Sequence, residues 1–248
     1  MNQKPSTDYE SAAERHARGR ARRKTVPRSS LGEWAPGPDR RDPVGLIEEQ
    51  NTDRLPWLVP VRHGRMGVSA FTFYRGAARI MATDLATTPT TGLMVQACGD
   101  AHLSNFGAYA SPERRLVFDL NDFDETLEGP WEWDVKRLAA SFAIAARHNK
   151  LGDGEGRRAT ARVARDYRKA MRRLAKMGAM QAWYSLVDEE GFLDYAKRAH
   201  MEKRAKSLVS KAKTKHSFQA LEKLAEEVDG ELRIKHEPPL LIPLRELQ

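Results

Sequence analysis

Side chains that could bind a metal ion are concentrated in one short stretch of this chain. Between positions 119 and 134 there are seven acidic residues and no Lys or Arg, although the chain as a whole has a net charge of +8. The seven are Asp119, Asp122, Asp124, Glu125, Glu128, Glu132 and Asp134. Crowded carboxylates repel one another unless a cation compensates them, and oxygen ligands favour Mg²⁺, Mn²⁺ or Ca²⁺. The stretch therefore predicts a metal site, with a solvated acidic loop as the simpler alternative.

A predicted β-hairpin would bring this stretch close to two polar residues upstream. Short apolar runs at 106–110 and 116–120 flank a Ser-Pro-Glu-Arg tetrad that suits a type I turn. Asn105 precedes the first strand and Asp119 lies near the end of the second, so antiparallel pairing brings these two ends together. Asp100 lies on the loop that enters the hairpin. We expect Asp100, Asn105 and Asp119 to form one metal-sized cluster beside a general base.

The order of these residues resembles a kinase catalytic site. An Asp-x-x-x-x-Asn segment, a hairpin and then an Asp is the arrangement of the kinase catalytic loop and metal-binding Asp. The form Gly99-Asp100-x-His102-x-x-Asn105 is more similar to the aminoglycoside and choline kinase branch than to the protein kinases. The later segment Trp133-Asp134-Val135-Lys136-Arg137-Leu138-Ala139 resembles the start of a helix in that branch.

More closely still, the chain resembles a bacterial family called domain of unknown function 2252 over roughly residues 60–245. The segments that carry this resemblance are Phe73-Tyr74-Arg75-Gly76-Ala77, Cys98-Gly99-Asp100-Ala101-His102-Leu103, Phe118-Asp119-Leu120-Asn121-Asp122-Phe123-Asp124-Glu125-Thr126 and Trp131-Glu132-Trp133-Asp134-Val135-Lys136-Arg137-Leu138. The resemblance implies a kinase-like fold in a bacterial protein, and it leaves the substrate open.

The kinase resemblance implies roles for individual residues. Asp100 would be the catalytic base that accepts the proton of the acceptor hydroxyl. Asn105 and Asp119 would bind Mg²⁺ (or Mn²⁺), and Asp122 is the rival to Asp119. The cofactors implied are this metal ion and ATP, and the partners are a nucleotide and a hydroxyl-bearing substrate. The supporting residues are His102, Asp124, Asp134 and Arg75.

Two of these supporting residues have alternative interpretations. His102 either orients the loop or fills a structural hydrogen bond, and we favour the structural role. Arg75 either reaches a phosphate from its helix or pairs with the acidic segment.

Two parts of a kinase site are missing upstream of Asp100. The only lysines there are Lys4 and Lys24, and no Gly-x-Gly-x-x-Gly segment occurs. A Gly-x-Gly-x-Gly stretch at 152–156 lies between two predicted helices, and we interpret it as a linker. We therefore expect a truncated, N-terminal portion of the family, with the nucleotide-clamping second lobe absent and with weak activity.

The elements that position these residues are predicted to form an α+β, predominantly helical fold, with a protein-kinase-like catalytic lobe that contains one small β-hairpin. Residues 1–45 are poor in apolar side chains and are predicted to be a disordered basic arm. Residues 46–248 would then be a partial kinase-like catalytic-lobe domain. Besides the hairpin, the expected elements are a helix at 69–86, a strand or buried turn at 94–98, helices from Asp134, at 157–176, from Trp183 and within 192–227, and strand-like pieces within 232–244.

Composition restricts where the protein acts. No run of about 18 apolar residues occurs, so we expect no transmembrane helix, and the first ten residues lack the apolar core of a secretory signal. The single cysteine, Cys98, excludes an intrachain disulfide and a cysteine-built zinc site. We expect a cytoplasmic protein without a membrane partner.

The positive net charge suggests nucleic acid as a binding partner. However, residues 1–41 hold ten basic side chains against five acidic ones, so much of the excess lies in the arm. We therefore favour solvated helix faces and a solubilising arm over nucleic-acid binding.

Three functions remain open from the sequence. The first is an atypical phosphotransferase that uses ATP and Mg²⁺ to modify a hydroxyl of a small molecule or a protein. The second is a non-catalytic protein that binds a metal, a nucleotide or a protein partner. The third is a metal-dependent phosphoesterase, because Gly99-Asp100-Ala101-His102 superficially fits such a motif, although no later Gly-Asn-His-Asp segment follows.

Overall fold

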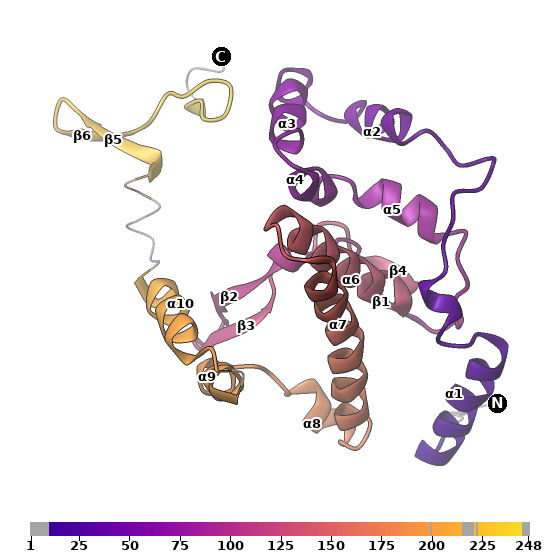
Figure 1. Ribbon diagram of the computed structural model, residues 1–248. Helices are drawn as coiled ribbons and strands as arrows, with labels where there is room; N and C mark the ends of the chain where they lie inside the picture. Colours follow the sequence, from indigo (N-terminus) through magenta and orange to yellow (C-terminus); the bar gives the residue numbers. More distant parts are fainter. Residues whose placement is uncertain (1–9, 199, 215–220, 222, 245–248) are drawn as a thin grey trace, which may run out of the picture.

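The computed structural model describes residues 10–198, 200–214, 221 and 223–244, which form a mainly helical α+β structure (Figure 1). The helices are α1 (Ala12–Thr25), α2 (Pro43–Asn51), α3 (Val59–Met66), α4 (Ala70–Arg75), α5 (Ala78–Leu85), α6 (Trp131–His148), α7 (Asp153–Leu174), α8 (Ala179–Trp183), α9 (Glu189–Arg198) and α10 (Glu202–Thr214). The strands are β1 (Met94–Ala97), β2 (Phe106–Ala110), β3 (Leu116–Leu120), β4 (Leu127–Pro130), β5 (Ala225–Val228) and β6 (Glu231–Ile234). The expected mixture of helices and small sheets is confirmed. Within the described part of the chain, none of the helices combines the length and the apolar composition that crossing a bilayer requires.

The strands pair in three separate two-stranded antiparallel sheets. The β2–β3 hairpin has the predicted bounds, and Gly107 lies opposite Asp119 in its register. The backbone N–H of Arg114 donates to the carbonyl of Ser111 at 2.8 Å and closes the expected turn. Strand β1 pairs with β4, which the sequence analysis did not predict.

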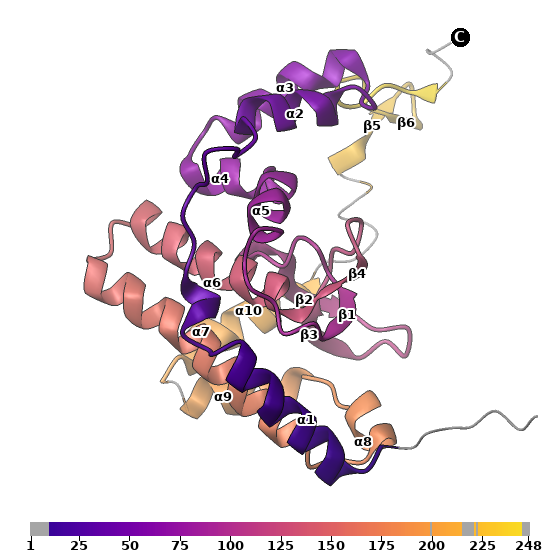
Figure 2. The same ribbon diagram turned by 90° about the vertical axis from the view of Figure 1, so that its right-hand side faces the viewer.

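Helix α6 is the central element of the fold. It packs along α7, as both views show (Figures 1 and 2), and the rings of Trp131 and Tyr167 stack at 5.5 Å between centroids with an interplanar angle of 4°. The buried side chains of α6 are Glu132, Arg137, Ser141 and Ala146. Three of these four are polar, so this helix buries hydrogen-bonding groups as well as apolar surface.

A separate apolar core lies beneath the helices that precede β1. It consists of Leu46, Ile47, Met66, Ala77 and Ile80, which come from α2, α3 and the start of α5. A Cβ atom added to Gly76 would lie 2.7 Å from the sulfur of Met66. The absence of a side chain at position 76 therefore lets Met66 fill this core.

Several predicted elements differ from the observed ones. The helix expected over 69–86 is two helices, α4 and α5, because α4 ends in a C-cap at Gly76, which Met66 covers. The helix expected from Asp134 begins three residues earlier, at Trp131.

Two further differences concern the C-terminal third of the chain. Trp183 ends α8 instead of beginning a helix, and the chain after it is extended, because the N–H of Phe118 donates to the carbonyl of Val187 at 2.8 Å. The helical prediction within 192–227 includes residues 225–227, which belong to strand β5. Strand β6 is paired with β5 antiparallel.

The N-terminal arm contains a helix where we expected disorder. Ser11 caps α1 with a capping box that includes Glu14, although no residue of α1 is buried. Two arginines attach this segment to the body: Arg22 donates to the carbonyl of Thr91, and Arg40 donates to both carboxylate oxygens of Asp84 at 2.7 and 2.8 Å. The division of the chain at residue 45 stays a prediction.

Candidate functional site

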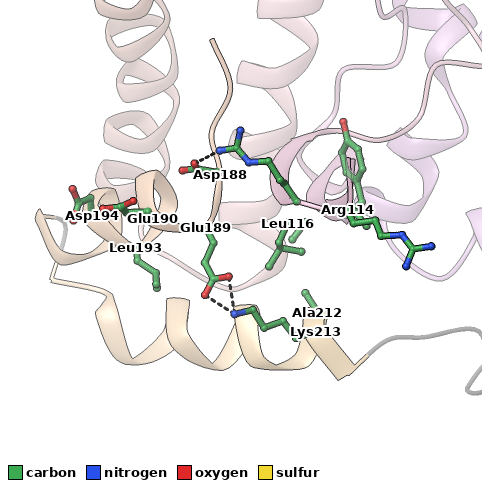
Figure 3. A pocket seen from close by; sticks show the side chains of 13 residues that line it. Arg114, Leu116, Asp188, Glu189, Glu190, Leu193, Asp194, Ala212 and Lys213 are labelled. Atoms are coloured by element: carbon green, nitrogen blue, oxygen red, sulfur yellow. Dashed lines mark hydrogen bonds and ion pairs between the residues drawn. The ribbon is translucent and has the colours of Figure 1, made fainter. Parts of the chain in front are cut away.

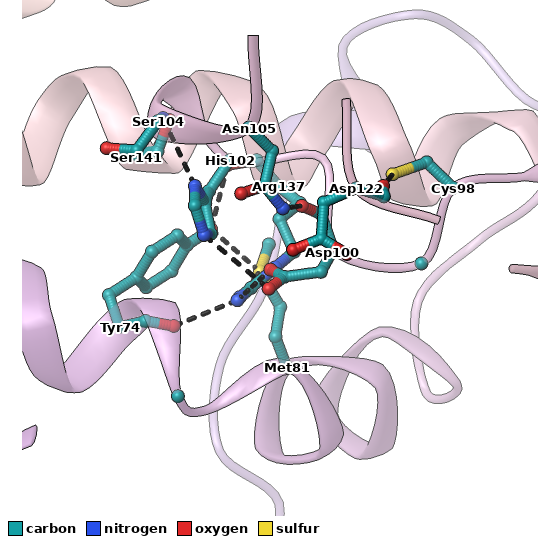
Figure 4. A network of polar contacts seen from close by, with 12 residues as sticks. Tyr74, Met81, Cys98, Asp100, His102, Ser104, Asn105, Asp122, Arg137 and Ser141 are labelled. Carbon is teal, nitrogen blue, oxygen red and sulfur yellow. Dashed lines mark hydrogen bonds and ion pairs between the residues drawn. The ribbon is translucent and has the colours of Figure 1, made fainter. Parts of the chain in front are cut away.

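Asp100 lies on the loop between β1 and β2, in the middle of a polar network (Figure 4). Its strongest partner is Arg137 of α6, whose side chain is 2% exposed. The Nε of Arg137 donates to Oδ1 of Asp100 at 2.5 Å, and Nη2 forms an ion pair with the same oxygen. The second oxygen, Oδ2, has one ionisable neighbour among the described residues, the Nε2 atom of His102 at 3.5 Å. The carboxylate is therefore held through one oxygen and keeps lone pairs on the other.

The guanidinium of Arg137 is itself positioned by Tyr74 of α4. Nη2 of Arg137 donates to the carbonyl of Tyr74 at 2.8 Å, and the guanidinium carbon lies 4.3 Å from the centre of the Tyr74 ring. The Tyr74 hydroxyl donates to the carbonyl of Arg137 at 2.8 Å. Burial raises the pKa of Tyr74 to about 12, with the charge of Arg137 opposing this shift, so the phenol stays a hydrogen-bond donor.

His102 is a buried neighbour of Asp100, with a residue exposure of 2%. Its Nδ1 accepts a hydrogen bond from the backbone N–H of Ser104 at 3.1 Å, so the neutral imidazole carries its proton on Nε2, toward Asp100. Burial lowers the pKa of His102; the charge of Asp100 opposes this effect, and the charges of Arg137 and Arg75 add to it. A neutral His102 that caps the backbone agrees with the structural role favoured from the sequence.

One face of α6 anchors the loop that carries Asp100. Asp134 accepts hydrogen bonds from the backbone N–H groups of Cys98 and Gly99, at 2.8 and 3.1 Å. Ser141 accepts one from the N–H of Leu103 at 3.0 Å. Together with Arg137, these residues have the spacing i, i+3, i+7, which places them on the same helix face. Sequence reasoning included Asp134 but missed Arg137 and Ser141, although two further polar residues at helical spacing from Asp134 could have indicated them.

Gly99 and Asn105 fix the two ends of this loop. Gly99 has φ = +83°, and a Cβ atom there would lie 2.2 Å from the carbonyl oxygen of Glu125, so the loop packs against the acidic segment at this point. Asn105 is buried, and its Nδ2 donates to the carbonyl of Asp100 at 2.8 Å. The Oδ1 atom of Asn105 has no hydrogen bond among the described residues.

The acidic residues lie at the exposed end of the same hairpin. Asp119 is opposite Gly107, two residues from Asn105, and its Oδ1 accepts from the N–H of Leu120 at 2.8 Å. Asp122 is exposed, and its backbone carbonyl oxygen accepts a hydrogen bond from the thiol of Cys98, with 3.6 Å between sulfur and oxygen.

Glu125 is the member of the acidic segment whose pKa is raised. The pKa of Glu125 is raised by desolvation and then by the negative charges of Asp100 and Asp122, while Arg137 opposes the shift. Burial is thus the first cause of the shift, and the charge of Asp100 adds to it. Asp124 is exposed, and its backbone N–H approaches Oδ1 of Asp122 at 3.5 Å.

The described residues do not include a preformed cluster of metal ligands. Among the described residues, no three His, Cys, Asp or Glu side chains converge in a way that could hold one. Grouping of Asp100, Asn105 and Asp119 around one ion therefore stays a prediction. Its donors are nevertheless suitable, because Asn105, Asp119 and Asp122 each keep a side-chain oxygen without a partner in the described part of the chain. Mg²⁺ commonly takes one or two protein carboxylates and completes its shell with water and substrate phosphates.

A pocket among the described residues lies elsewhere. It has a volume of about 1090 Å³ and lies at the turn end of the β2–β3 hairpin, against α9 and α10 (Figure 3). Its charged groups are partly paired, since Arg115 contacts Asp188 at 2.6 Å and Lys213 contacts Glu189 at 2.7 Å. None of the residues proposed for catalysis or metal binding lines this pocket. Arg75, by contrast, is exposed near His102 and has no ion pair among the described residues.

Comparisons with known proteins give one match. The family model described as "Uncharacterized protein conserved in bacteria (DUF2252)" matches residues 54–248. No curated protein and no solved structure matches the chain. The match includes Asp100, Arg137 and the acidic segment.

Proposed function

This chain belongs to the bacterial family DUF2252, and we propose that it is a kinase-like phosphotransferase that moves a phosphoryl group from ATP to a hydroxyl group. The observation that carries this proposal is how the two carboxylate oxygens of Asp100 are bound. Its Oδ1 is held by the buried Arg137, and its Oδ2 stays available beside a neutral His102. A carboxylate that is oriented but keeps a free oxygen is suited to accept a proton from an approaching hydroxyl.

The oxygens that would hold a metal ion belong to Asn105 and Asp119, with Asp122 as the alternative to Asp119. Asn105 directly precedes β2, Asp119 lies in β3, and Asp122 follows the end of β3 by two residues. A bound Mg²⁺ or Mn²⁺ would neutralise negative charge on the nucleotide phosphates. Burial raises the pKa of Glu125, and the negative charges of Asp100 and Asp122 add to this shift; those two charges support a cation in this region.

Other residues would orient the reacting groups. Asp134 and Ser141 hold the loop through its backbone, which keeps Asp100 in place. Arg75 is an unpaired cation among the described residues, and it is close enough to His102 to affect its pKa. We assign Arg75 to a phosphate of the nucleotide, in place of the missing lysine.

Weak turnover is expected from this chain by itself. It has no lysine between Lys24 and Lys136 and no phosphate-cradling Gly-rich loop before Asp100. Phosphoryl transfer depends on positioning and on neutralising charge, so loss of these parts lowers the rate more than it lowers metal affinity.

Titration of the metal and measurement of ADP release test the proposal. Calorimetry with Mn²⁺ should show binding that Asp119→Asn or Asp122→Asn weakens about tenfold, because a carboxylate ligand is lost. ADP release from Mg²⁺-ATP, with water as acceptor, should fall at least tenfold in Asp100→Asn without a matching loss of Mn²⁺ affinity. Asp53→Asn, an exposed carboxylate without an ion pair among the described residues, is the matched control for both measurements.

Two results would replace the proposal with an alternative. Nucleotide binding with no ADP release above background would support a non-catalytic nucleotide-binding protein. Hydrolysis of p-nitrophenyl phosphate with Mn²⁺ in the absence of nucleotide, lost in Asp119→Asn, would support a metal-dependent phosphoesterase.

A further inference from the structure

Strand β2 has a free edge on the side that faces away from β3. Strand β3 has neighbours on both sides, because the N–H of Phe118 also donates to the carbonyl of Val187, and Val117 forms a bridge with Asp188. On the outer side of β2, by contrast, no strand pairs with it in the described part of the chain. The sheet therefore ends at β2.

The register of the hairpin determines which backbone groups point outward from this edge. The N–H of Ser111 donates to the carbonyl of Arg115 at 2.8 Å, which makes this cross-strand pair a hydrogen-bonded one. Hydrogen-bonded and non-hydrogen-bonded pairs alternate along an antiparallel ladder. Ala110 and Ala108 are thus at non-hydrogen-bonded positions, and their N–H and C=O groups point away from β3. The N–H of Phe118, which lies opposite Ala108, points outward from β3 in the same way.

The pocket of about 1090 Å³ extends along this edge (Figure 3). Its lining includes Ala108, Tyr109 and Ala110, which are three consecutive exposed residues. Successive side chains of a strand point to opposite faces, so a pocket lined by all three reaches the edge between those faces. Leu193 of α9 and Ala212 of α10 belong to its helical wall.

The sequence of β2 has none of the features that usually block an edge strand. Its five residues, Phe-Gly-Ala-Tyr-Ala, include no proline and no charged side chain, and they pair with β3 one to one without a bulge. Proteins protect exposed edges by these means, because unpaired N–H and C=O groups bind another strand. The edge of β2 is therefore able to accept an added strand.

The charges that line the pocket favour a basic peptide. Two ion pairs within it, Arg115 with Asp188 and Lys213 with Glu189, neutralise themselves. The carboxylates of Glu190 and Asp194 have no ion pair among the described residues, and the spacing i, i+4 places them on the same side of α9. One cation of the lining, Arg114 in the hairpin turn, is likewise without an ion pair in that part of the chain. The uncompensated charge of the pocket is thus negative.

We propose that the edge of β2 binds an extended, basic peptide segment of a partner protein. The peptide adds as a strand through the N–H and C=O groups of Ala108 and Ala110, and its basic side chains pair with Glu190 and Asp194. None of the residues proposed for catalysis or metal binding lines this pocket, so the proposal does not rest on the phosphotransferase function.

Fluorescence anisotropy with a labelled peptide of about six residues, in which lysine and valine alternate, tests the backbone pairing. Two further peptides have the same sequence, with the backbone nitrogens methylated at every lysine or at every valine. Only alternate N–H groups of an added strand face its neighbour. One methylated peptide should therefore bind at least about tenfold more weakly than the parent, and the other should remain within about threefold.

A substitution at Ala108 tests the same contact from the side of the protein. Ala108→Pro removes an N–H that the hairpin does not use, and edge strands accept proline at such positions. The parent peptide should bind at least about tenfold more weakly to this variant. Ala108→Ser, which keeps the N–H, is the matched control and should bind within about twofold of the wild type. Thermal midpoints show whether both variants are folded, and the methylated peptides give the result on the wild type in either case.

A pair of charge variants tests the preference for a basic peptide. Glu190→Gln combined with Asp194→Asn should weaken binding at least about threefold at low salt. Glu48→Gln combined with Asp53→Asn is the matched control, because it removes two exposed carboxylates that have no ion pair among the described residues. This control should leave the affinity nearly unchanged.

Four outcomes would overturn the proposal. The first is the absence of saturable binding up to about 1 mM peptide. The second is that both methylated peptides, or neither, lose affinity. The third is tighter binding of a peptide in which glutamate replaces lysine. The fourth is a wild-type dimer that Ala108→Pro converts to a monomer, since a second copy of this chain would then occupy the edge.

Discussion

Arg137 contacts only one oxygen of Asp100. Both Nε and Nη2 approach Oδ1, and Oδ2 is left with His102 at 3.5 Å. Because Arg137 is 2% exposed, its charge depends on Asp100 for compensation, and the orientation of Asp100 depends on α6. The residue proposed to accept a proton is thus oriented by a buried side chain of α6.

Removal of Arg137 should destabilise the protein strongly. Arg137→Met leaves the largely buried Asp100 carboxylate unpaired, so we expect the free energy of unfolding in urea to fall by about 3–5 kcal/mol. Adding Asp100→Asn to this variant should recover part of the loss, because the uncompensated charge is gone. Arg79→Met, which breaks an exposed pair with Glu49, should cost about 1 kcal/mol or less. Equal losses for Arg79→Met and Arg137→Met would contradict this account.

Gly99→Ala should also be strongly destabilising. The left-handed backbone costs about 1–2 kcal/mol for a residue with a side chain, and the new Cβ would collide with the carbonyl oxygen of Glu125, 2.2 Å away. We expect a total loss above about 2 kcal/mol in urea unfolding. Gly64→Ala, in α3 with nothing within 4 Å, is the control and should leave stability unchanged or raise it by about 0.5–1 kcal/mol. A tolerated Gly99→Ala would mean that the loop can move away from the acidic segment.

His102 should make the protein less stable in acid. Its pKa is lowered in the folded protein, so the unfolded chain binds a proton more readily as the pH falls through about 6.5, and the free energy of unfolding decreases there. His102→Asn keeps an acceptor for the N–H of Ser104 but cannot titrate. Urea midpoints at about pH 7.5 and pH 5.5 should therefore differ less in this variant than in the wild type. His16→Asn, at an exposed histidine, should retain the wild-type difference.

Cys98 should be a slow nucleophile while the protein is folded. Burial raises the pKa of its thiol to about 11, and the charges of Asp134, Asp100 and Asp122 add to the shift while a backbone hydrogen bond opposes it. At pH 8 only about one thiol in a thousand is then ionised, compared with roughly a quarter for an ordinary cysteine. Because Cys98 is the only cysteine, mass spectrometry after iodoacetamide treatment reports on it directly. Alkylation should be at least tenfold faster in urea; equal rates in both states would be inconsistent with a buried thiol.

Patterns that depend on neighbouring residues could be predicted from the sequence. Two short apolar runs and a Pro-containing turn were enough for the bounds of β2 and β3, because a short hairpin is specified by its own strands and turn. The placing of Asp100 on the loop before the hairpin follows from the same local information. The likeness to the DUF2252 family was also visible in short segments, and the family match confirms it.

Pairings between distant residues required the tertiary structure. Strand β4 forms against β1, far upstream, and the extended chain at Val187 depends on the N–H of Phe118. In each of these pairs the two segments are far apart in the sequence, so the local periodicity of one segment does not indicate the other.

The site illustrates the same limit. The sequence by itself determined which carboxylates and amides are available, but it did not determine that Arg137 pairs with Asp100 or that Ser141 anchors Leu103. Those contacts depend on which face of α6 turns toward the loop, and burial of that face decides it. The pocket of about 1090 Å³ likewise forms where the hairpin, α9 and α10 come together, away from Asp100 and the acidic segment. The sequence thus determined which side chains are present, whereas tertiary packing decided which side chains pair with one another. The physical reason is that a buried charge or N–H group is stable only where the fold supplies its partner.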